Sequence, residues 1–335
     1  MALLLLLLMI VFVLSWQLTG LVRRYALAKQ WLDIPNARSS HFTATPSSGG
    51  LAFVGVFLIG ITGLLIMHRL PLTTWLSFCG AGIAVGWIGF QDDKQSVAIH
   101  WRLLVHLLAA VWGLCWLSDS AVNVLSGLSV ELSWLGLILY LVWLLNLYNF
   151  MDGINGLAAV EAITVCLSAF LLLLAIQATL FWALPLLACS VLGFLLWNFP
   201  AAKIFMGDVG SGFLGLMLGL FSLETSYDKP NMWFCWLILL GVFIVDASVT
   251  LVRRAFSGQK IYQAHRTHAY QYAARRWASH TKVTIVVAAI NVVWLLPWAL
   301  LVALERVSVN VGLLCAYIPL IGLALYFKAG CTETA

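Results

Sequence analysis

The chain has 335 residues, of which 63% are hydrophobic and 9% carry a charge, and its formal net charge is +5. Because a soluble domain has about 25% charged residues, this composition excludes an ordinary soluble protein, and we expect no nucleic acid among its partners. Apolar runs of about 20 residues, the length at which a helix crosses a bilayer, follow one another along the chain. They predict an all-α polytopic integral membrane protein.

We expect about eleven transmembrane helices in a single domain that covers residues 1–335. Positive charge at Arg23 and Arg24 follows the first apolar run instead of preceding it, so this run differs from a signal peptide and should remain as a helix. The predicted spans are 2–20, 49–67, 74–90, 103–118, 133–150, 156–176, 180–198, 211–224, 232–252, 283–303 and 311–327.

The polar connections alternate between two sides and differ in charge. One side receives fifteen of the eighteen Lys and Arg residues, and the other receives Arg69, Lys229 and Arg306. By the positive-inside rule the first side is cytoplasmic, which places the N-terminus outside and the C-terminus in the cytoplasm. The predicted cytoplasmic connections are 21–48, 91–102, 151–155, 199–210 and 253–282.

A polar stretch lies between two apolar runs at residues 146–158. Asn146, Asn149 and Asp152 recur every three residues, so on a helix they share one drifting face. Asn155 continues the series after Gly153. Three other polar stretches also fall in predicted cytoplasmic connections, which indicates a single site at the cytoplasmic surface.

The second stretch is the acidic pair Asp92 and Asp93 at the end of the third predicted span. Charge near a bilayer is costly, and neighbouring carboxylates repel each other. Binding of a divalent cation or of a phosphate group would explain the pair. The alternative is two solvated acids in a loop.

The third stretch runs from Phe205 to Gly212 and contains Asp208 among glycines, just before an apolar run. Glycine allows a backbone to approach a phosphate closely, and a helix start offers unpaired N–H groups to an anion. A carboxylate in this position is a ligand for Mg²⁺. The alternative is a glycine-rich turn with an N-capping aspartate.

The fourth stretch is basic and lies in the connection 253–282, where His265 and His268 are three residues apart with Arg266 between them. We interpret these residues as phosphate contacts. An ordinary positive-inside loop, or an interfacial helix that binds anionic lipid, is the alternative for the remaining basic residues.

Two further acids lie inside apolar runs. We expect Asp246 to pair with a basic neighbour such as Arg253 or Arg254, and the role of Glu161 stays open.

Together these residues resemble the polyprenyl-phosphate N-acetylhexosamine-1-phosphate transferases, of glycosyltransferase 4 type. The resemblance covers nearly the whole chain. It rests on Asp92-Asp93, Asn149-Phe-Met-Asp-Gly-Ile-Asn-Gly-Leu-Ala, Asn198-Phe-Pro-Ala-Ala-Lys-Ile-Phe-Met-Gly-Asp and the loop histidines. Within the family, Pro35-Asn-Ala-Arg-Ser-Ser-His41 and Ala264-His-Arg-Thr-His-Ala-Tyr-Gln271 look most like the O-antigen initiating transferases.

The resemblance implies a reaction in which a UDP-N-acetylhexosamine gives its sugar-1-phosphate to undecaprenyl phosphate, with UMP as the second product. It implies a location in the bacterial inner membrane, with the site on the cytoplasmic face, and is compatible with a homodimer. The sugar stays open among N-acetylglucosamine, N-acetylgalactosamine, N-acetylfucosamine and N-acetylquinovosamine.

The resemblance also implies roles for residues. Asp92, Asp93, His265 and His268 would be catalytic. Asp208 and Asn149 would hold Mg²⁺, for which Mn²⁺ could substitute. Phe205 resembles the aromatic residue that stacks on uracil. The remaining substrate-binding residues would be Asp152, Asn155, Asn198 and Arg266.

The sequence departs from the family pattern in three places. Ser47 and Ser48 stand where many members have Arg-Gly, and Asn155 stands where many have Asp. The loop reads His-Arg-Thr-His in place of a denser histidine cluster, which leaves open which histidine is essential.

Two questions of function stay open at this stage. The acceptor phosphate could attack the donor directly, or Asp92 or Asp93 could form a covalent intermediate. A transporter of polyprenyl lipids or nucleotide sugars is the alternative class, but it should place its polar residues near the membrane midplane.

Overall fold

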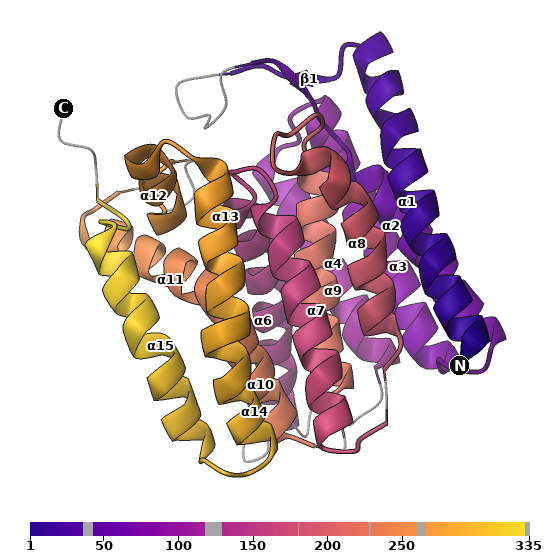
Figure 1. Cartoon of the computed structure of the whole chain (residues 1–335), viewed down its shortest axis with the longest axis vertical. Helices are drawn as coiled ribbons and strands as arrows, with labels where there is room; N and C mark the ends of the chain where they lie inside the picture. The colour runs from indigo at the N-terminus through magenta and orange to yellow at the C-terminus, as the bar shows by residue number, and fades with distance from the viewer. Residues whose placement is uncertain (36–42, 118–128, 180, 228, 260–264, 332–335) are drawn as a thin grey trace.

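The computed structural model describes residues 1–35, 43–117, 129–179, 181–227, 229–259 and 265–331. Its helices run side by side as a bundle, and α1 begins at one end of the bundle whereas α15 ends at the other (Figure 1). Most of the segment Pro35–His41, with Arg38, and the positions Lys260 and Ala264 lie outside the described residues.

The helices follow closely the apolar runs of the sequence. In chain order they are α1 (Ala2–Ala28), α2 (Gly50–Ile66), α3 (Leu72–Lys94), α4 (Ile99–Trp116), α6 (Val130–Met151), α7 (Leu157–Ala175), α8 (Ala183–Asn198), α9 (Asp208–Glu224), α10 (Asn231–Leu239), α11 (Gly241–Phe256), α12 (Ala269–Trp277), α13 (His280–Ala289), the π-helical η1 (Ile290–Leu295), α14 (Leu296–Ala303) and α15 (Val309–Tyr326).

Three of these helices begin at a serine whose hydroxyl accepts a hydrogen bond from the first turn, as helix N-caps do. Ser129 starts α6, Ser279 starts α13 and Ser308 starts α15. The cap explains why each helix begins at that residue and not earlier in the preceding connection.

Nine of the eleven predicted spans coincide with one helix each. The span 232–252 falls on α10 and α11, and the span 283–303 falls on α13, η1 and α14. Not every helix meets the length and hydropathy expected of a full span. Within the described residues seven do, and the count rises to eight if α10 and α11, bent by 72° at their junction, form one span. Helices α2 and α8 are apolar but shorter. The protein is thus a polytopic helical membrane protein, whereas the count of eleven and the orientation of the termini stay predictions.

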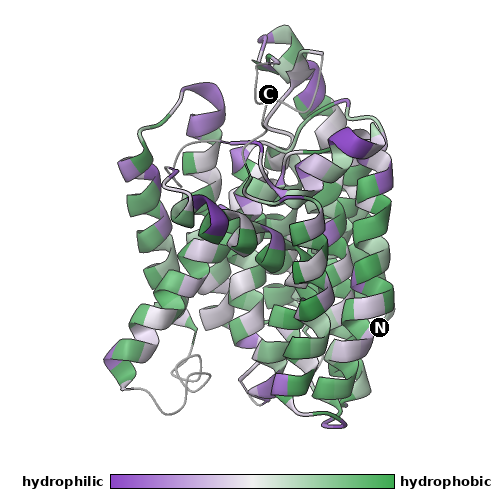
Figure 2. Cartoon of the chain, turned by 90° about the vertical axis from the view of Figure 1, so that its left-hand side faces the viewer, coloured by the Kyte–Doolittle hydropathy of each residue, from purple (hydrophilic) through white to green (hydrophobic). Residues whose placement is uncertain are grey.

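The distribution of hydrophobic and hydrophilic residues agrees with a membrane helix bundle. Hydrophobic residues extend along the helices, and hydrophilic residues gather toward the ends of the bundle (Figure 2). Helix α9 differs from its neighbours because every residue from Val209 to Leu223 is buried, as expected of a helix that is apolar all round. It packs mainly against α3 and α6 and also contacts α2, α4, α7 and α10.

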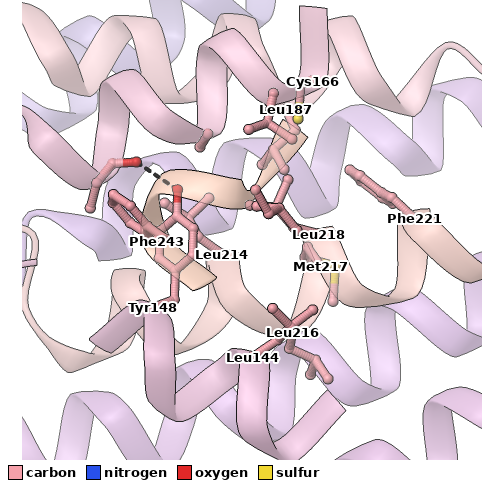
Figure 3. Packing of buried hydrophobic residues seen from close by; sticks show 14 of the residues in the cluster. Leu144, Tyr148, Cys166, Leu187, Leu214, Leu216, Met217, Leu218, Phe221 and Phe243 are labelled. Atoms are coloured by element: carbon pink, nitrogen blue, oxygen red, sulfur yellow. Dashed lines mark hydrogen bonds between the residues drawn. The ribbon is translucent and has the colours of Figure 1, made fainter. Parts of the chain in front are cut away.

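The core around α9 is made of large apolar side chains from several helices, among them Leu144 of α6, Leu187 of α8 and Phe243 of α11 (Figure 3). Tyr148 is fully buried there, and its hydroxyl donates to the Ala158 carbonyl at 2.7 Å. A buried tyrosine hydroxyl needs such a partner. This bond ties the end of α6 to the start of α7 across the polar stretch that joins them.

Three features add detail to the predicted helical fold. The first predicted cytoplasmic connection contains a short antiparallel pair, β1 (Leu32–Asp33) and β2 (Thr45–Pro46). The connection 253–282 contains α12, a helix too short and too polar to be recognised as a span. The span predicted at 232–252 is broken between α10 and α11.

Candidate active site

A cavity of about 400 Å³ lies where the ends of α3, α6 and α9 meet. Three of the four polar stretches border it, although they are far apart in the chain. The predicted site residues among its lining are Asp93, Asn149, Asp152, Asn155, Asn198, Phe205 and Asp208. The structure therefore brings these residues, from separate segments of the chain, together at one cavity.

Asp93 is anchored against the start of α9. Its carboxylate accepts hydrogen bonds from the Asp208 backbone N–H at 2.7 Å and from the Ser48 hydroxyl at 2.9 Å. Gly207 makes this approach possible, because its φ is +76° and a Cβ there would lie 2.2 Å from Asp93 Oδ2. The glycine-rich stretch thus serves to bring a carboxylate and a helix start into contact.

Asp92 has different partners from Asp93. Its side chain accepts from the Val97 N–H at 2.7 Å and forms an ion pair with Arg102. Arg102 also contacts the Asp208 carboxylate at 3.0 Å, so one guanidinium joins two acids. Asp92 is not among the residues that line the cavity. The adjacent acids therefore have different partners, and the catalytic role of each stays a prediction.

The carboxylates at the cavity disturb one another. Burial raises the pKa of Asp208, Asp92 adds to this, and Arg102 opposes it. Burial raises the pKa of Asp152 well above its usual value, and the charges of Asp208 and Asp93 add to the effect. Asn149 offers Asp208 a side-chain hydrogen bond. So many acids in one enclosed space favour the binding of a cation.

Asn198 holds the loops of the site together. Its Oδ1 accepts from the Gly156 N–H at 2.7 Å, and its Nδ2 donates to the Ile204 carbonyl at 2.9 Å. Asn155 donates to the Pro200 carbonyl at 3.2 Å. Asn198 borders the cavity as predicted, but both ends of its amide are engaged with the protein, so its main role here is to position the loops.

A second cavity of about 800 Å³ adjoins the first, with Asn155, Phe205 and His280 in the lining of both. Arg266 and Arg275 line the second cavity, which makes it basic. Phe205 therefore stands at the junction between an acidic and a basic compartment, and Arg266 lies on the basic side.

His265 and His268 do not line either cavity. His268 is 1% exposed, and its ring stacks on that of His265 with centroids 4.9 Å apart. Both rings lie near Phe150, at 6.3 and 6.4 Å. Burial lowers the pKa of His265 to about 4, helped by His268 and Arg254, so this imidazole is neutral at pH 7. Direct contact of these histidines with phosphate stays a prediction.

Asp246 holds this histidine pair and α12 together. Its carboxylate accepts from the backbone N–H groups of Ala269 and Tyr270, both at 2.9 Å, and lies 3.3 Å from His268 Nδ1. We expected Asp246 to pair with Arg253 or Arg254, but Arg253 donates instead to the Ala329 carbonyl. Because the N–H groups at a helix start attract negative charge, the aspartate has a better partner than the arginine.

The two comparisons with known proteins agree. Residues 75–226 match the model of glycosyl transferase family 4. The chain is 32% identical over 247 residues to the phospho-N-acetylmuramoyl-pentapeptide-transferase of Moorella thermoacetica, which covers 67% of this chain and 74% of that protein. The chain belongs to the polyprenyl-phosphate N-acetylhexosamine-1-phosphate transferases of glycosyl transferase family 4.

Two other relatives extend the similarity along the chain. The undecaprenyl-phosphate alpha-N-acetylglucosaminyl 1-phosphate transferase of Thermotoga maritima is 26% identical over 276 residues, covering 82% of this chain and 84% of the relative. The probable undecaprenyl-phosphate N-acetylglucosaminyl 1-phosphate transferase of Bacillus subtilis is 28% identical over 296 residues, covering 83% and 79%. The family 4 segment contains every predicted site residue from Asp92 to Asp208 but ends before the histidines.

The oxygen donors of this family 4 site fit a magnesium ion in kind. Asp93, Asn149, Asp152 and Asp208 border one cavity, and carboxylate and amide oxygens are the ligands that Mg²⁺ takes. Within the described residues, however, no three His, Cys, Asp or Glu side chains stand at ligand spacing. Arg102 contacts one of these acids, Asp208, and also pairs with Asp92.

Sequence reasoning missed three residues of the site. Arg102 was counted only as a positive-inside charge. It lies in the first turn of α4, after a short connection from the acidic pair at the end of α3, and this position could have indicated an ion pair. Ser48 was noted only as a departure from the family pattern. His280 lines both cavities and stands at the first residue of α13, which no motif marked.

Proposed function

We propose that this protein transfers N-acetylhexosamine-1-phosphate from a UDP-sugar to undecaprenyl phosphate, giving undecaprenyl-diphosphate-sugar and UMP. The observation that carries the proposal is the convergence of Asp93, Asn149, Asp152 and Asp208 on one cavity at the end of a membrane helix bundle. The similar transferases of Bacillus subtilis and Thermotoga maritima suggest the class of reaction.

The two adjoining cavities suit the donor. Ligand pockets measure about 300–1,000 Å³, and the cavities of about 400 and 800 Å³ share Phe205 at their junction. We place the uracil against Phe205, the diphosphate toward Asp208, and the sugar among Asp152, Asn155 and the loop that Asn198 holds.

An apolar cavity of about 270 Å³ between α11, α12, α13 and α15 suits the lipid acceptor. Tyr270 lines this cavity, while its hydroxyl donates to the Phe150 carbonyl at 3.0 Å beside Gly153. One side chain thus separates the apolar cavity from the polar loop that borders the acidic cavity. We place the first isoprene units here, with the phosphate directed toward the histidines and Arg266.

Asp208 and Asn149, with Asp93 beside them, are the residues that would hold Mg²⁺ or Mn²⁺. When bound, the cation neutralises charge on the donor diphosphate and so favours the departure of UMP. Arg102 adds positive charge to the same group of acids.

We favour direct attack by an acceptor phosphate oxygen on the sugar-bearing phosphorus, with cleavage of its bond to the UMP oxygen. The second pKa of a phosphate monoester is near ~6, so the acceptor is mostly dianionic at pH 7 and is already a nucleophile. Asp93 borders the cavity and would orient the acceptor or remove a remaining proton, whereas Asp92 holds Arg102 in place. The rival is a covalent phosphoryl-aspartate.

The site would face the cytoplasm of a bacterial cell, where UDP-sugars are made, and the product would start an O-antigen or another cell-envelope polysaccharide. A homodimer is compatible with this role. The transporter alternative draws on two features inside the bundle: the 72° bend between α10 and α11, and the hydrogen bond of 2.7 Å from Asn291 to the buried Glu161.

The experiment is to incubate detergent-purified protein with Mg²⁺, undecaprenyl phosphate and each of four UDP-N-acetylhexosamines in turn. We expect equal amounts of UMP and lipid-linked sugar with at least one donor. Absence of UMP with every donor, together with uptake of the nucleotide sugar into proteoliposomes, would support the transporter instead. Omitting the lipid tests the covalent route. If an aspartate is the nucleophile, UMP appears as a stoichiometric burst without the lipid; with direct attack it does not.

A further inference from the structure

The described residues that follow α15 lie against the histidine loop (His265–His268). After α15, residues Ala329–Cys331 form a segment that we call the C-terminal brace. The Gly330 N–H donates to the Thr267 carbonyl at 2.7 Å. Thr267 lies between the two histidines, and its hydroxyl is 3.0 Å from His265 Nδ1. The brace is therefore one hydrogen bond from the backbone that carries both imidazoles.

The brace is itself fixed to the helices on either side of the loop. Arg253 of α11 donates to the Ala329 carbonyl and to the Cys331 sulfur, both at 2.9 Å. The Tyr272 hydroxyl of α12 donates to the Cys331 carbonyl at 2.6 Å. Ala329 is fully buried. The brace is thus held at both ends, at Ala329 and at Cys331.

Gly330 is required by the closeness of the packing. Its φ is +77°, and a Cβ would lie 2.8 Å from the Thr250 carbonyl oxygen and 2.9 Å from Arg253 Cβ. The left-handed backbone at this position and the lack of room for a Cβ beside Thr250 and Arg253 together favour glycine. A larger residue would move the N–H away from Thr267.

The histidine loop has other attachments, but they hold other atoms. Asp246 holds His268 and the start of α12, and Arg275 donates to the Arg266 carbonyl at 3.2 Å. The brace acts on the Thr267 carbonyl, midway along the loop. Because the loop has no regular secondary structure of its own, its shape depends on such contacts.

We propose that the C-terminal brace is a positioning element for the histidine loop, with Gly330 and Cys331 as its working residues. The brace fixes the Thr267 carbonyl, which sets the stacked His265 and His268 at one place beside Phe150. Its effect on turnover rests on the proposed function; its effect on loop order does not.

The test compares two truncations of the full chain in detergent. One ends at Ala329 and loses the Gly330 N–H and the Cys331 carbonyl; the matched control ends at Cys331 and keeps them. We measure hydrogen exchange of the Ala269 and Tyr270 amides, which report opening of the loop against Asp246. We expect exchange at least about 10-fold faster in the first truncation and unchanged exchange in the control.

Kinetics supply the second measurement. A misplaced loop lowers kcat more than it changes the KM for the UDP-sugar, because orientation controls the chemical step; we expect a loss of about 10-fold in kcat with KM within about 2-fold. Tyr272→Phe removes only the hydroxyl and keeps the ring that lies 4.5 Å from the Arg275 guanidinium. Tyr272→Phe should also speed amide exchange and lower kcat, but by less than the truncation. If the truncation does not fold, this variant decides whether the brace positions the loop.

The outcomes separate the two proposals. Equal exchange in both truncations and in Tyr272→Phe overturns the brace, whatever the activity. Faster exchange in a protein that transfers no sugar from any UDP donor leaves the brace standing and removes the proposed function.

Discussion

The acidic cavity and the histidine loop are built in different ways. The cavity is formed by the ends of α3, α6 and α9, and α9 is buried along nearly its whole length. The histidine loop lies between α11 and α12 and is held by individual contacts: the Asp246 carboxylate lies beside His268 Nδ1, and Arg275 and Gly330 donate to carbonyls of the loop. The cavity thus takes its geometry from a packed core, and the loop takes its geometry from a few polar contacts.

This difference predicts how each region responds to substitution. At the cavity a charge can be removed without moving the backbone, so activity should fall while the fold persists. At the loop the same kind of change removes a structural support, so activity and local order should fall together.

The largest effect is expected for Asp208→Asn. The variant keeps the size of the side chain but removes a negative charge from the cavity, so turnover should fall at least about 10²-fold, the scale of losing a principal electrostatic stabiliser. Initial rates over a range of Mg²⁺ concentrations, with thermal unfolding as the control for folding, measure this. Normal activity at limiting Mg²⁺ would remove Asp208 from the proposed metal site.

Arg102→Gln should have the next largest effect. The guanidinium joins Asp92 and Asp208, so its loss leaves these acids to repel each other. Removing one partner of a fully buried ion pair lowers the free energy of unfolding by about 3–5 kcal/mol. The loss is smaller here because the pair is partly exposed. We expect turnover to fall by about 30-fold. Arg102→Lys keeps the charge and serves as the matched control, and equal losses in both variants would point to geometry instead of charge.

The motifs of the cavity could be predicted from sequence because each is short and lies at a helix end. Asp93, Asn149 and Asp208 were identified in this way, and the structure brings them together. The supports of the loop could not be predicted, because they join residues far apart: Gly330 with Thr267, and Asp246 with Ala269. Spacing also could not show that Asp92 and Asp93 diverge, since that depends on where Arg102 and Ser48 lie.

A smaller effect is expected from pH. Burial raises the pKa of Asp208 above the usual value of about 3.9, so this carboxylate takes up a proton closer to neutrality than an ordinary aspartate does. Activity should therefore fall on acidification with a midpoint above about 5, and the lost activity should return when the pH is restored. Arg102→Gln should move the midpoint to higher pH, because Arg102 opposes protonation of Asp208.

Rates at saturating substrates between pH 4.5 and 8 provide the measurement. His265 should not contribute to the limb near neutrality, because its pKa is lowered to about 4. A midpoint below about 4.5, or one that does not move in Arg102→Gln, would contradict the assignment to Asp208.

The smallest effect separates the two regions most directly and concerns Asp246→Asn. An asparagine can still accept one hydrogen bond from the start of α12, but it brings no negative charge to the N–H groups of Ala269 and Tyr270 or to His268. Loss of a helix cap of this kind costs about 1 kcal/mol. We expect faster exchange of the two amides and a loss of turnover of about 5-fold, with the pH midpoint unchanged because the cavity carboxylates are untouched. Thr250→Val is the matched control, since it removes a donor 3.2 Å from Asp246 Oδ1 and leaves the contacts to α12. A loss above about 10²-fold in Asp246→Asn, with normal amide exchange, would mean that the Asp246–His268 pair takes part in the chemistry itself and that the loop belongs with the cavity as one catalytic unit.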